Sequence, residues 1–346
     1  MQTKEKRINL KSLTIGELEN LMISLGEPSF RTKQIFQWLY KYAYSFEDMT
    51  NISKPLRAKL SECAYIGRME IEKKYISRID ETRRYLLKLE DGNFIEAVLM
   101  KYKHGYTICI STQVGCAMGC TFCASTKAGK VRNLSTGELI EQILVIQEDL
   151  ESRISNVVMM GIGEPLDNFE NVMKFLENVN NEHGLNIGHR HICLSTCGVV
   201  DKIYALAEKE LQITLSISLH ATDDEERSKI MPINKKYNIE SLLKACRNYT
   251  EKTSRRISFE YTLIDGVNDS EKNARELANL VYGMLCHVNL IPVNRVKETD
   301  YRASGTERIE RFRKILEDSN ITATVRREMG SDISAACGQL RRTRME

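Results

Sequence analysis

Several features are scarce or missing in this sequence. It has only 5 prolines and 19 glycines in 346 residues, with no internal repeat and no low-complexity tract. The first residues, MQTKEKRINLKSL, are charged and contain no apolar segment, so we expect no secretory signal. No stretch approaches the roughly 18 consecutive apolar residues of a membrane span. We therefore expect a cytoplasmic protein with no membrane partner.

A large excess of charge of one sign is also missing. The net charge is only +3, so global charge does not identify a nucleic-acid-binding protein. Basic residues cluster at both ends of the chain: Lys4, Lys6, Arg7 and Lys11, then Arg341, Arg342 and Arg344. Such clusters are either solvated termini or contacts for RNA phosphates. No coiled-coil pattern or apolar stripe indicates an oligomer, so we expect a monomer.

Cysteine, by contrast, occurs 10 times, and in a reducing cytosol thiols serve metals and catalysis rather than disulfides. Cys116, Cys120 and Cys123 stand in a C-x3-C-x2-C spacing, with the aromatic Phe122 before the third cysteine. A closed zinc site and a ferredoxin-type cluster each need four ligands, and no fourth cysteine lies nearby. The spacing predicts a [4Fe-4S] cluster with one iron open to a ligand that is not protein. The alternative is three unrelated core cysteines.

The length permits one large domain and a smaller one. Apolar residues at helical spacing predict helices over 15–22 and 33–40, separated by the breaker at 26–29. Residues 84–89 and 94–100 read as a β-hairpin with an Asp91-Gly92 turn. We expect a helical N-terminal domain over 1–80, a β-hairpin linker over 81–104 and the main domain over 105–346.

From residue 105 onward, predicted strands alternate with predicted helices. The strands are Thr107–Ser111, Asn156–Gly161, His191–Thr196, Ile213–Leu219, Ile257–Leu263 and His287–Val293, with helices such as Ser135–Asp149, Glu170–Asn178 and Asn273–Leu285 between them. This alternation predicts an α/β fold with parallel strands and right-handed crossovers. Six units are too few for a complete eight-fold barrel, so we expect a partial (βα)6, TIM-like barrel. A further strand is expected over Thr322–Arg327.

Polar and small residues follow several of these strands, at the edge where parallel folds bind ligands. The cysteine loop follows the first strand, and Gly161 to Pro165 closes the second. The residues we select from later strand ends are Ser195, then Ser218, Leu219 and His220, then Asn294. Two of these sites have a structural alternative: Gly163-Glu164 could be a plain turn, and His220 could have a packing role. The close pair His189 and His191 is a poor metal site.

Taken in order, these blocks resemble the RlmN/Cfr family of radical S-adenosylmethionine (SAM) enzymes. The quoted motifs are the stretch from Cys109 to Cys116, the three-cysteine loop, Gly163-Glu164-Pro165, Ser218 to Thr222, Arg227 to Asn234, and Ala336-Cys337-Gly338-Gln339-Leu340. The resemblance covers almost the whole chain. Ser125-Thr126 and Arg295 depart from the commoner RlmN pattern.

The resemblance implies that Cys116, Cys120 and Cys123 hold the cluster and that SAM binds its open iron. SAM contacts would come from Gly163, Glu164, Ser195, Ser218, Leu219, His220 and Asn294. The expected enzyme is an RNA methyltransferase that modifies C2 of adenine in 23S rRNA, at the peptidyl transferase centre, and in tRNA, 3′ of the anticodon. The alternative is Cfr-like methylation of C8 of the same rRNA adenine. A one-electron donor such as flavodoxin or ferredoxin is also implied.

The catalytic residues implied are Cys337, Cys109 and Glu96. Cys337 would accept a methyl group. That methyl group would lose a hydrogen atom, and the resulting carbon radical would add to adenine C2. Glu96 would accept the C2 proton, although from sequence alone an exposed hairpin glutamate is the default reading. Cys109 would then release the product by forming a disulfide with Cys337.

Two other classes compete with this hypothesis. A radical SAM enzyme acting on a small molecule or a protein would need neither a helical RNA-binding module nor the pair Cys109 and Cys337. An iron–sulfur electron carrier or a non-catalytic RNA-binding module would leave the polar strand ends unexplained.

Overall fold

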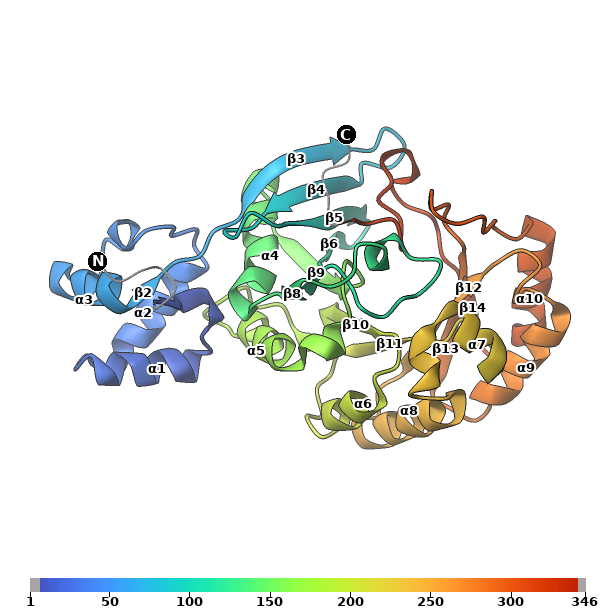
Figure 1. Cartoon of the computed structure of the whole chain (residues 1–346). Helices are drawn as coiled ribbons and strands as arrows, with labels where there is room; N and C mark the ends of the chain where they lie inside the picture. Colours follow the sequence, from blue (N-terminus) through green and yellow to red (C-terminus); the bar gives the residue numbers. More distant parts are fainter. Residues whose placement is uncertain (1–6, 342–346) are drawn as a thin grey trace.

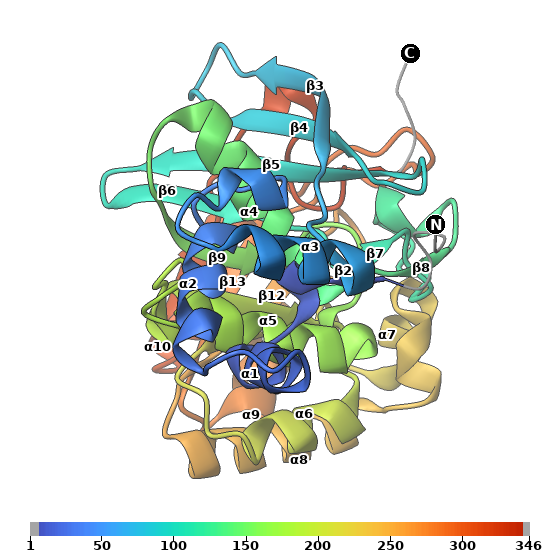
Figure 2. The ribbon, with the colours of Figure 1, turned by 90° about the vertical axis from the view of Figure 1, so that its left-hand side faces the viewer.

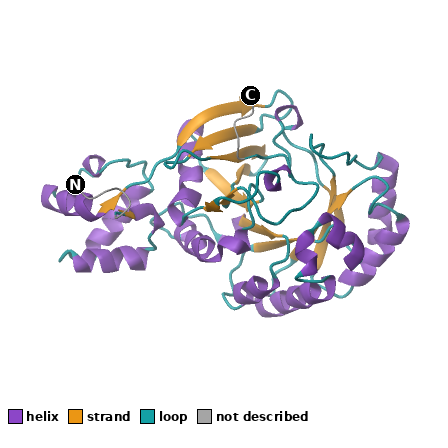
Figure 3. Ribbon diagram, viewed as in Figure 1, coloured by secondary structure: helices purple, strands orange, loops and turns teal. Residues whose placement is uncertain are grey.

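The structure is a computed structural model that describes residues 7–341, and it has two visible parts (Figure 1). A small helical module lies at one side, and a long sheet wrapped by helices forms the rest (Figure 3). Lys4, Lys6, Arg342 and Arg344, from the predicted basic clusters, lie outside the described residues. No helix within 7–341 is long and apolar enough to cross a membrane.

The helical module contains three α-helices and a short parallel strand pair. The helices are α1 (Ile15–Ser24), α2 (Phe30–Leu39) and α3 (Lys54–Cys63), with 3-10 turns η2 (Leu10–Ser12) and η3 (Phe46–Asp48), and strands β1 (Ile8–Asn9) and β2 (Ala64–Tyr65). Thr14 begins α1 through a capping box, because its Oγ1 accepts from the Glu17 amide at 3.2 Å and Glu17 Oε2 accepts from the Thr14 amide at 2.9 Å. Both predicted helices are present, and α2 begins three residues earlier than predicted.

One ten-stranded sheet runs through the rest of the molecule, in the order β14-β13-β12-β11-β10-β9-β6-β5-β4-β3. Its strands are β3 (Glu70–Ile76), β4 (Arg83–Lys88), β5 (Phe94–Tyr102), β6 (Gly105–Cys109), β9 (Ile154–Met159), β10 (Ile192–Thr196), β11 (Thr214–Ser218), β12 (Ile257–Leu263), β13 (Cys286–Pro292) and β14 (Ala323–Val325). The seven strands from β6 to β14 are parallel. The six predicted barrel strands and the strand near the C-terminus are therefore confirmed.

Helices cover the outer side of the parallel strands (Figure 1). They are α4 (Thr136–Leu150), α5 (Phe169–Asn180), α6 (Val200–Ala207), α7 (Asp224–Ile230), α8 (Ile239–Thr253), α9 (Glu271–Val281) and α10 (Thr306–Asp318). Short elements at the strand ends complete the fold: β7 (Gln113–Val114) paired with β8 (Arg132–Asn133), and the 3-10 turns η4 (Ala124–Thr126), η5 (Pro165–Asn168), η6 (His189–His191), η7 (Pro232–Lys235) and η8 (Ser331–Ile333). The architecture is the predicted partial barrel, extended by a seventh parallel strand.

The antiparallel part of the sheet differs from the sequence expectation. The predicted hairpin is present as β4 and β5, but β5 also pairs with β6, so the hairpin continues the barrel sheet. Within the stretch predicted to be helical, residues 70–76 form β3 and pair with β4. Its sequence, Glu-Ile-Glu-Lys-Lys-Tyr-Ile, carries the charged residues typical of an edge strand.

The helical module is joined to the barrel through buried polar contacts with α4. Lys11 is fully buried, donates to the Gly67 carbonyl at 3.1 Å and forms an ion pair with Glu141 of α4. Ser12 Oγ accepts from the Gly137 amide at 3.1 Å. Lys11 is thus not part of a solvated terminus, as one reading of the basic cluster proposed. Figure 2 shows the module in front of the barrel on this side.

Candidate active site

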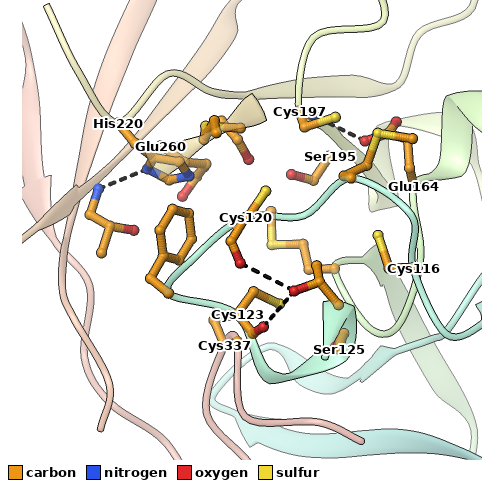
Figure 4. Close-up of a pocket in the computed structure, with 18 of the residues that line it drawn as sticks. Cys116, Cys120, Cys123, Ser125, Glu164, Ser195, Cys197, His220, Glu260 and Cys337 are labelled. Carbon is orange, nitrogen blue, oxygen red and sulfur yellow. Dashed lines mark hydrogen bonds between the residues drawn. The ribbon is translucent and has the colours of Figure 1, made fainter. Parts of the chain in front are cut away.

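The cysteine loop follows β6 and is folded tightly by glycine and by side-chain hydrogen bonds. Gly115 has φ +77°, and a Cβ there would lie 1.8 Å from the Gly129 carbonyl oxygen, so only glycine fits. Thr126 Oγ1 donates to the carbonyls of Cys120 at 3.2 Å and Cys123 at 3.0 Å. These contacts hold Cys116, Cys120 and Cys123 on the wall of one cavity (Figure 4).

The three thiols have the chemistry that a cluster requires. Burial raises the pKa of Cys116 to about 12 and also raises the pKa values of Cys120 and Cys123. Neighbouring loop thiols add to the rise for Cys116 and Cys120, and the Cys337 thiol adds to it for Cys123. Iron would therefore displace their protons on binding. Among the described residues, no group of three or more Cys, His, Asp or Glu side chains is arranged to hold a single metal ion. A cluster does not need such convergence, because each thiolate binds a different iron. The donor set fits a [4Fe-4S] cluster.

The end of β9 forms the second wall of the cavity. Gly163 has φ +106°, and a Cβ there would lie 2.6 Å from Gln113 Cβ, so a side chain is excluded. The Glu164 carboxylate is buried and accepts from the amides of Leu166 at 3.0 Å and Cys197 at 2.8 Å. Burial raises its pKa. The carboxylate faces the cavity with lone pairs left for an ammonium ligand (Figure 4).

The ends of β10 and β11 bring Ser195, Ser218 and His220 to the same cavity. Leu219 is fully buried and does not line it. His220 has φ +59°, and its Nδ1 accepts from the Thr262 amide at 2.9 Å. Burial, with a smaller contribution from the Arg227 charge, lowers the pKa of His220 to about 3, so the ring is neutral. Its edge-to-face partner is Phe122 of the cysteine loop, with ring centroids 4.9 Å apart.

The C-terminal segment carries Cys337 into this cavity. The Gly338 carbonyl accepts from the Ala124 amide at 2.7 Å, and the Leu340 carbonyl accepts from Ser125 Oγ at 2.8 Å. Asn294 lines the cavity and donates to the Cys337 carbonyl at 2.9 Å. Cys337 is thereby fixed beside the cysteine loop, as Figure 4 shows.

Cys109, at the end of β6, is buried behind the cavity wall. Its pKa is raised to about 12, first by burial and then by the neighbouring Cys337 thiol. The two thiols interact electrostatically, and both are free in the structure. Sequence analysis pairs these two cysteines through the family resemblance.

Glu96, on β5, is buried rather than exposed, which corrects the default reading of a hairpin glutamate. Its Oε1 accepts from Arg84 Nη1 at 3.0 Å, and its Oε2 accepts from the Arg341 amide at 2.7 Å. Burial raises its pKa, while both arginines oppose the rise. Glu96 does not line the cavity itself; the end of the C-terminal segment covers it.

Sequence reasoning missed two charged residues of the cavity. Arg326, at the end of β14, has a guanidinium 4.0 Å from the buried Glu260 carboxylate of β12, and both residues line the cavity. The thiols of Cys337 and Cys109 both raise the pKa of Arg326, which lines the cavity together with Cys337. No sequence signal separates Arg326 from its neighbour Arg327, because only the fold decides which of the two faces the barrel interior.

Two family models match this chain. Residues 110–278 match the radical SAM superfamily, and residues 8–66 match the N-terminal domain of ribosomal RNA large subunit methyltransferases. The second match covers the helical module, and the first begins just after β6 and covers most of the barrel.

Similar proteins align with nearly the whole chain. A probable dual-specificity RNA methyltransferase RlmN from Clostridium botulinum is 59% identical over 335 residues, which are 97% of this chain and 96% of that protein. Its counterpart from Alkaliphilus oremlandii is 58% identical over 99% of both chains. The crystal structure of a radical SAM methyltransferase from Sphaerobacter thermophilus superposes with a TM-score of 0.91 and 44% identity, over 96% of this chain and 99% of that one.

Proposed function

The chain belongs to the RlmN family of radical SAM RNA methyltransferases, and from that premise we propose that it methylates C2 of adenine in 23S rRNA and in tRNA through a methyl group carried on Cys337. The rRNA target would be the adenine of the peptidyl transferase centre, and the tRNA target the adenine 3′ of the anticodon. The observation that carries the proposal is the position of Cys337, which lines the same cavity as the three loop cysteines.

The cavity offers groups for both cofactors that the superfamily implies. Cys116, Cys120 and Cys123 would hold the cluster. SAM would take its polar contacts from the ends of β9, β10, β11 and β13, at Gly163, Glu164, Ser195, Ser218, His220 and Asn294. Leu219 would contribute only through its backbone, because its side chain is buried away from the cavity. When bound, the cluster and SAM supply a transferable methyl group and a radical that abstracts hydrogen.

The carrier is needed because adenine C2 is electrophilic and cannot take a methyl directly from a sulfonium. Cys337, as a thiolate, first displaces the methyl from one SAM and forms a thioether. Loss of a hydrogen atom from that methyl leaves a carbon radical on Cys337, which adds to C2. The RNA is then bonded covalently to the enzyme.

Release requires a base and a second thiol. Glu96 does not line the cavity, so it would accept the C2 proton through a water relay, and its burial makes its carboxylate a stronger base than an exposed one. Cys109 attacks the Cys337 sulfur, the bond from sulfur to the new methyl carbon breaks, and a disulfide forms. The methyl carbon takes up one proton. From the carbon radical onward, the enzyme and RNA together lose one proton and one electron. Glu96 would take the proton, and the electron would pass to the oxidised cluster when it is present.

We also propose the cellular setting that RNA substrates imply: a cytoplasmic enzyme, acting as a monomer and reduced by a flavodoxin- or ferredoxin-type donor.

Anaerobic turnover with transcribed rRNA and tRNA fragments tests the proposal. We expect 2-methyladenosine in the digested RNA, none with Cys337→Ala, and a covalent RNA–protein complex with Cys109→Ala. Cys63→Ala, a cysteine of α3 remote from the cavity, is the matched control and should behave like the wild type. Appearance of 8-methyladenosine would favour the Cfr-like alternative, and no methylated adenosine in either RNA would overturn the proposal.

A further inference from the structure

Arg227 of α7 is fully buried, and within residues 7–341 its guanidinium forms no ion pair. Its hydrogen bonds all go to neutral oxygen atoms: backbone carbonyls and one side-chain amide. Burying an arginine without a carboxylate partner is costly, so its five N–H donors need hydrogen-bond acceptors to offset that cost. The block from Arg227 to Asn234 also has no part in the proposed chemistry, although sequence analysis had selected it.

One side of the guanidinium joins two neighbouring strand ends. Nη2 donates to the Cys197 carbonyl at 2.8 Å, beyond β10, and to the Ser218 carbonyl at 3.1 Å, at the end of β11. Nε donates to the Leu219 carbonyl at 3.0 Å. These same two strand ends carry Ser195, Ser218 and His220 into the cavity. The planar guanidinium of an arginine can donate to the carbonyls of both strand ends at once, which the single ammonium of a lysine cannot do.

The other side of the guanidinium closes the segment that follows α7. Nη1 donates to Asn234 Oδ1 at 3.0 Å, and the Asn234 amide donates to Ser228 Oγ at 2.9 Å and to the Asp224 carbonyl at 3.0 Å. Asn234 is itself buried. This network fixes the path of residues 227–234.

That fixed segment contacts the cysteine loop directly. The Ile230 carbonyl accepts from the Thr121 amide at 2.9 Å, between the second and third loop cysteines. The Pro232 ring lies 3.3 Å from the position that a Cβ would take on Gly119. Arg227 is therefore linked through one rigid segment to the cysteine loop and, through its own hydrogen bonds, to two strand ends.

Its charge acts on the same region. Arg227 Nη2 lies 2.8 Å from the carbonyl of Cys197, which lines the same cavity as the three loop cysteines. A buried charge is poorly screened, so it would favour any anionic group bound by the loop thiols.

We propose that Arg227 is a positioning residue that fixes the strand ends contacting SAM relative to the cysteine loop, and that its buried positive charge favours the reduced cluster. This inference rests on the proposed function, because it assumes that SAM and the cluster occupy this cavity.

The test uses the full-length, anaerobically reconstituted enzyme with two substitutions of Arg227. Arg227→Met removes both the hydrogen bonds of the guanidinium and its charge. We therefore expect SAM to bind roughly ten- to a hundredfold more weakly, and the cluster to have a lower reduction potential. In Arg227→Lys the charge is kept, so the potential should stay near the wild-type value while SAM affinity remains reduced. Lys229→Met, on the exposed side of the same helix, is the control and should change neither.

The measurements are equilibrium SAM binding, a redox titration of the cluster signal and thermal unfolding of the protein. If Arg227→Met only lowers the unfolding temperature, with wild-type SAM affinity and potential, the inference is overturned. If Arg227→Met does not fold, Asn234→Ala decides: weakened SAM binding supports positioning, and wild-type binding overturns it. A wild-type enzyme that binds neither cluster nor SAM would instead overturn the proposed function itself.

Discussion

At the scale of single residues, burial and a nearby positive charge act in opposite directions on the pKa of the Cys109 thiol. Cys109 has a pKa of about 12, so at neutral pH almost all of it is the unreactive thiol. The Arg326 charge opposes that rise, and the buried Glu260 lies beside Arg326. Arg326 therefore favours the Cys109 thiolate, which is the nucleophile in the proposed release step.

We expect Arg326→Met to slow release of RNA from the covalent complex, because the Cys109 pKa would rise further. Below that pKa the thiolate fraction grows about tenfold per pH unit, so release should accelerate from pH 7 to pH 9 in both proteins and stay slower in the variant. The lifetime of the complex on denaturing gels measures this. Arg327→Met, the exposed neighbour, serves as the control. Release that is independent of pH, or equal in Arg326→Met and wild type, would refute this role.

At the scale of elements, the strand ends were predictable and the C-terminal segment was not. Alternating apolar strands and helices locate β6 to β13, and parallel strands bring their C-terminal ends together whatever the loops do. The path of residues 326–341 depends instead on tertiary hydrogen bonds such as Gly338 to Ala124 and Leu340 to Ser125. Sequence alone could therefore select Cys337 only through the family resemblance.

The burial of particular charged residues was equally inaccessible to sequence. Glu96 lies in an alternating hairpin, where its neighbours cannot show that the C-terminal segment covers it. Lys11 sits in a basic run that resembles a solvated terminus, yet it is buried against α4. In both cases the partner is far away in the chain.

The cysteine loop makes an element-scale prediction. Anaerobic reconstitution should give about four irons per chain in the wild type. Cys116→Ala should hold far less iron and lose turnover, because only two of the three loop ligands, Cys120 and Cys123, then remain on the cavity wall (Figure 4). Cys246→Ala, on the buried face of α8, controls for general loss of stability. A Cys116→Ala protein with a full cluster and normal turnover would contradict the assignment.

A second prediction at this scale concerns the junction between the helical module and α4. Lys11→Met leaves Glu141 buried without its cation, so we expect a loss of about 3–5 kcal/mol in the free energy of unfolding. The double variant Lys11→Met with Glu141→Leu removes both charges and should recover most of that loss. Urea unfolding measures both, with Lys59→Met of an exposed pair as the control. A single variant as stable as the wild type would show that the pair does not hold the junction.

At the scale of the whole molecule, the fold brings segments that are far apart in the sequence to one cavity. The cysteine loop, the ends of β9 to β13, the end of β14 and the C-terminal segment each supply part of it. The helical module is joined to the same barrel through α4 and matches a ribosomal RNA methyltransferase N-terminal domain. This arrangement suits a route in which the methyl group stops at Cys337 between SAM and RNA.

Isotopic labelling of the methyl group tests that route most directly. With SAM carrying a CD3 group, one deuterium leaves when hydrogen is abstracted from the methyl on Cys337, and a solvent proton enters at release. The account therefore predicts CD2H on adenine C2 by mass spectrometry of the digested RNA, together with a labelled methyl on the Cys337 peptide before RNA is added. An intact CD3 group on the RNA, or turnover with no label on Cys337, would contradict it.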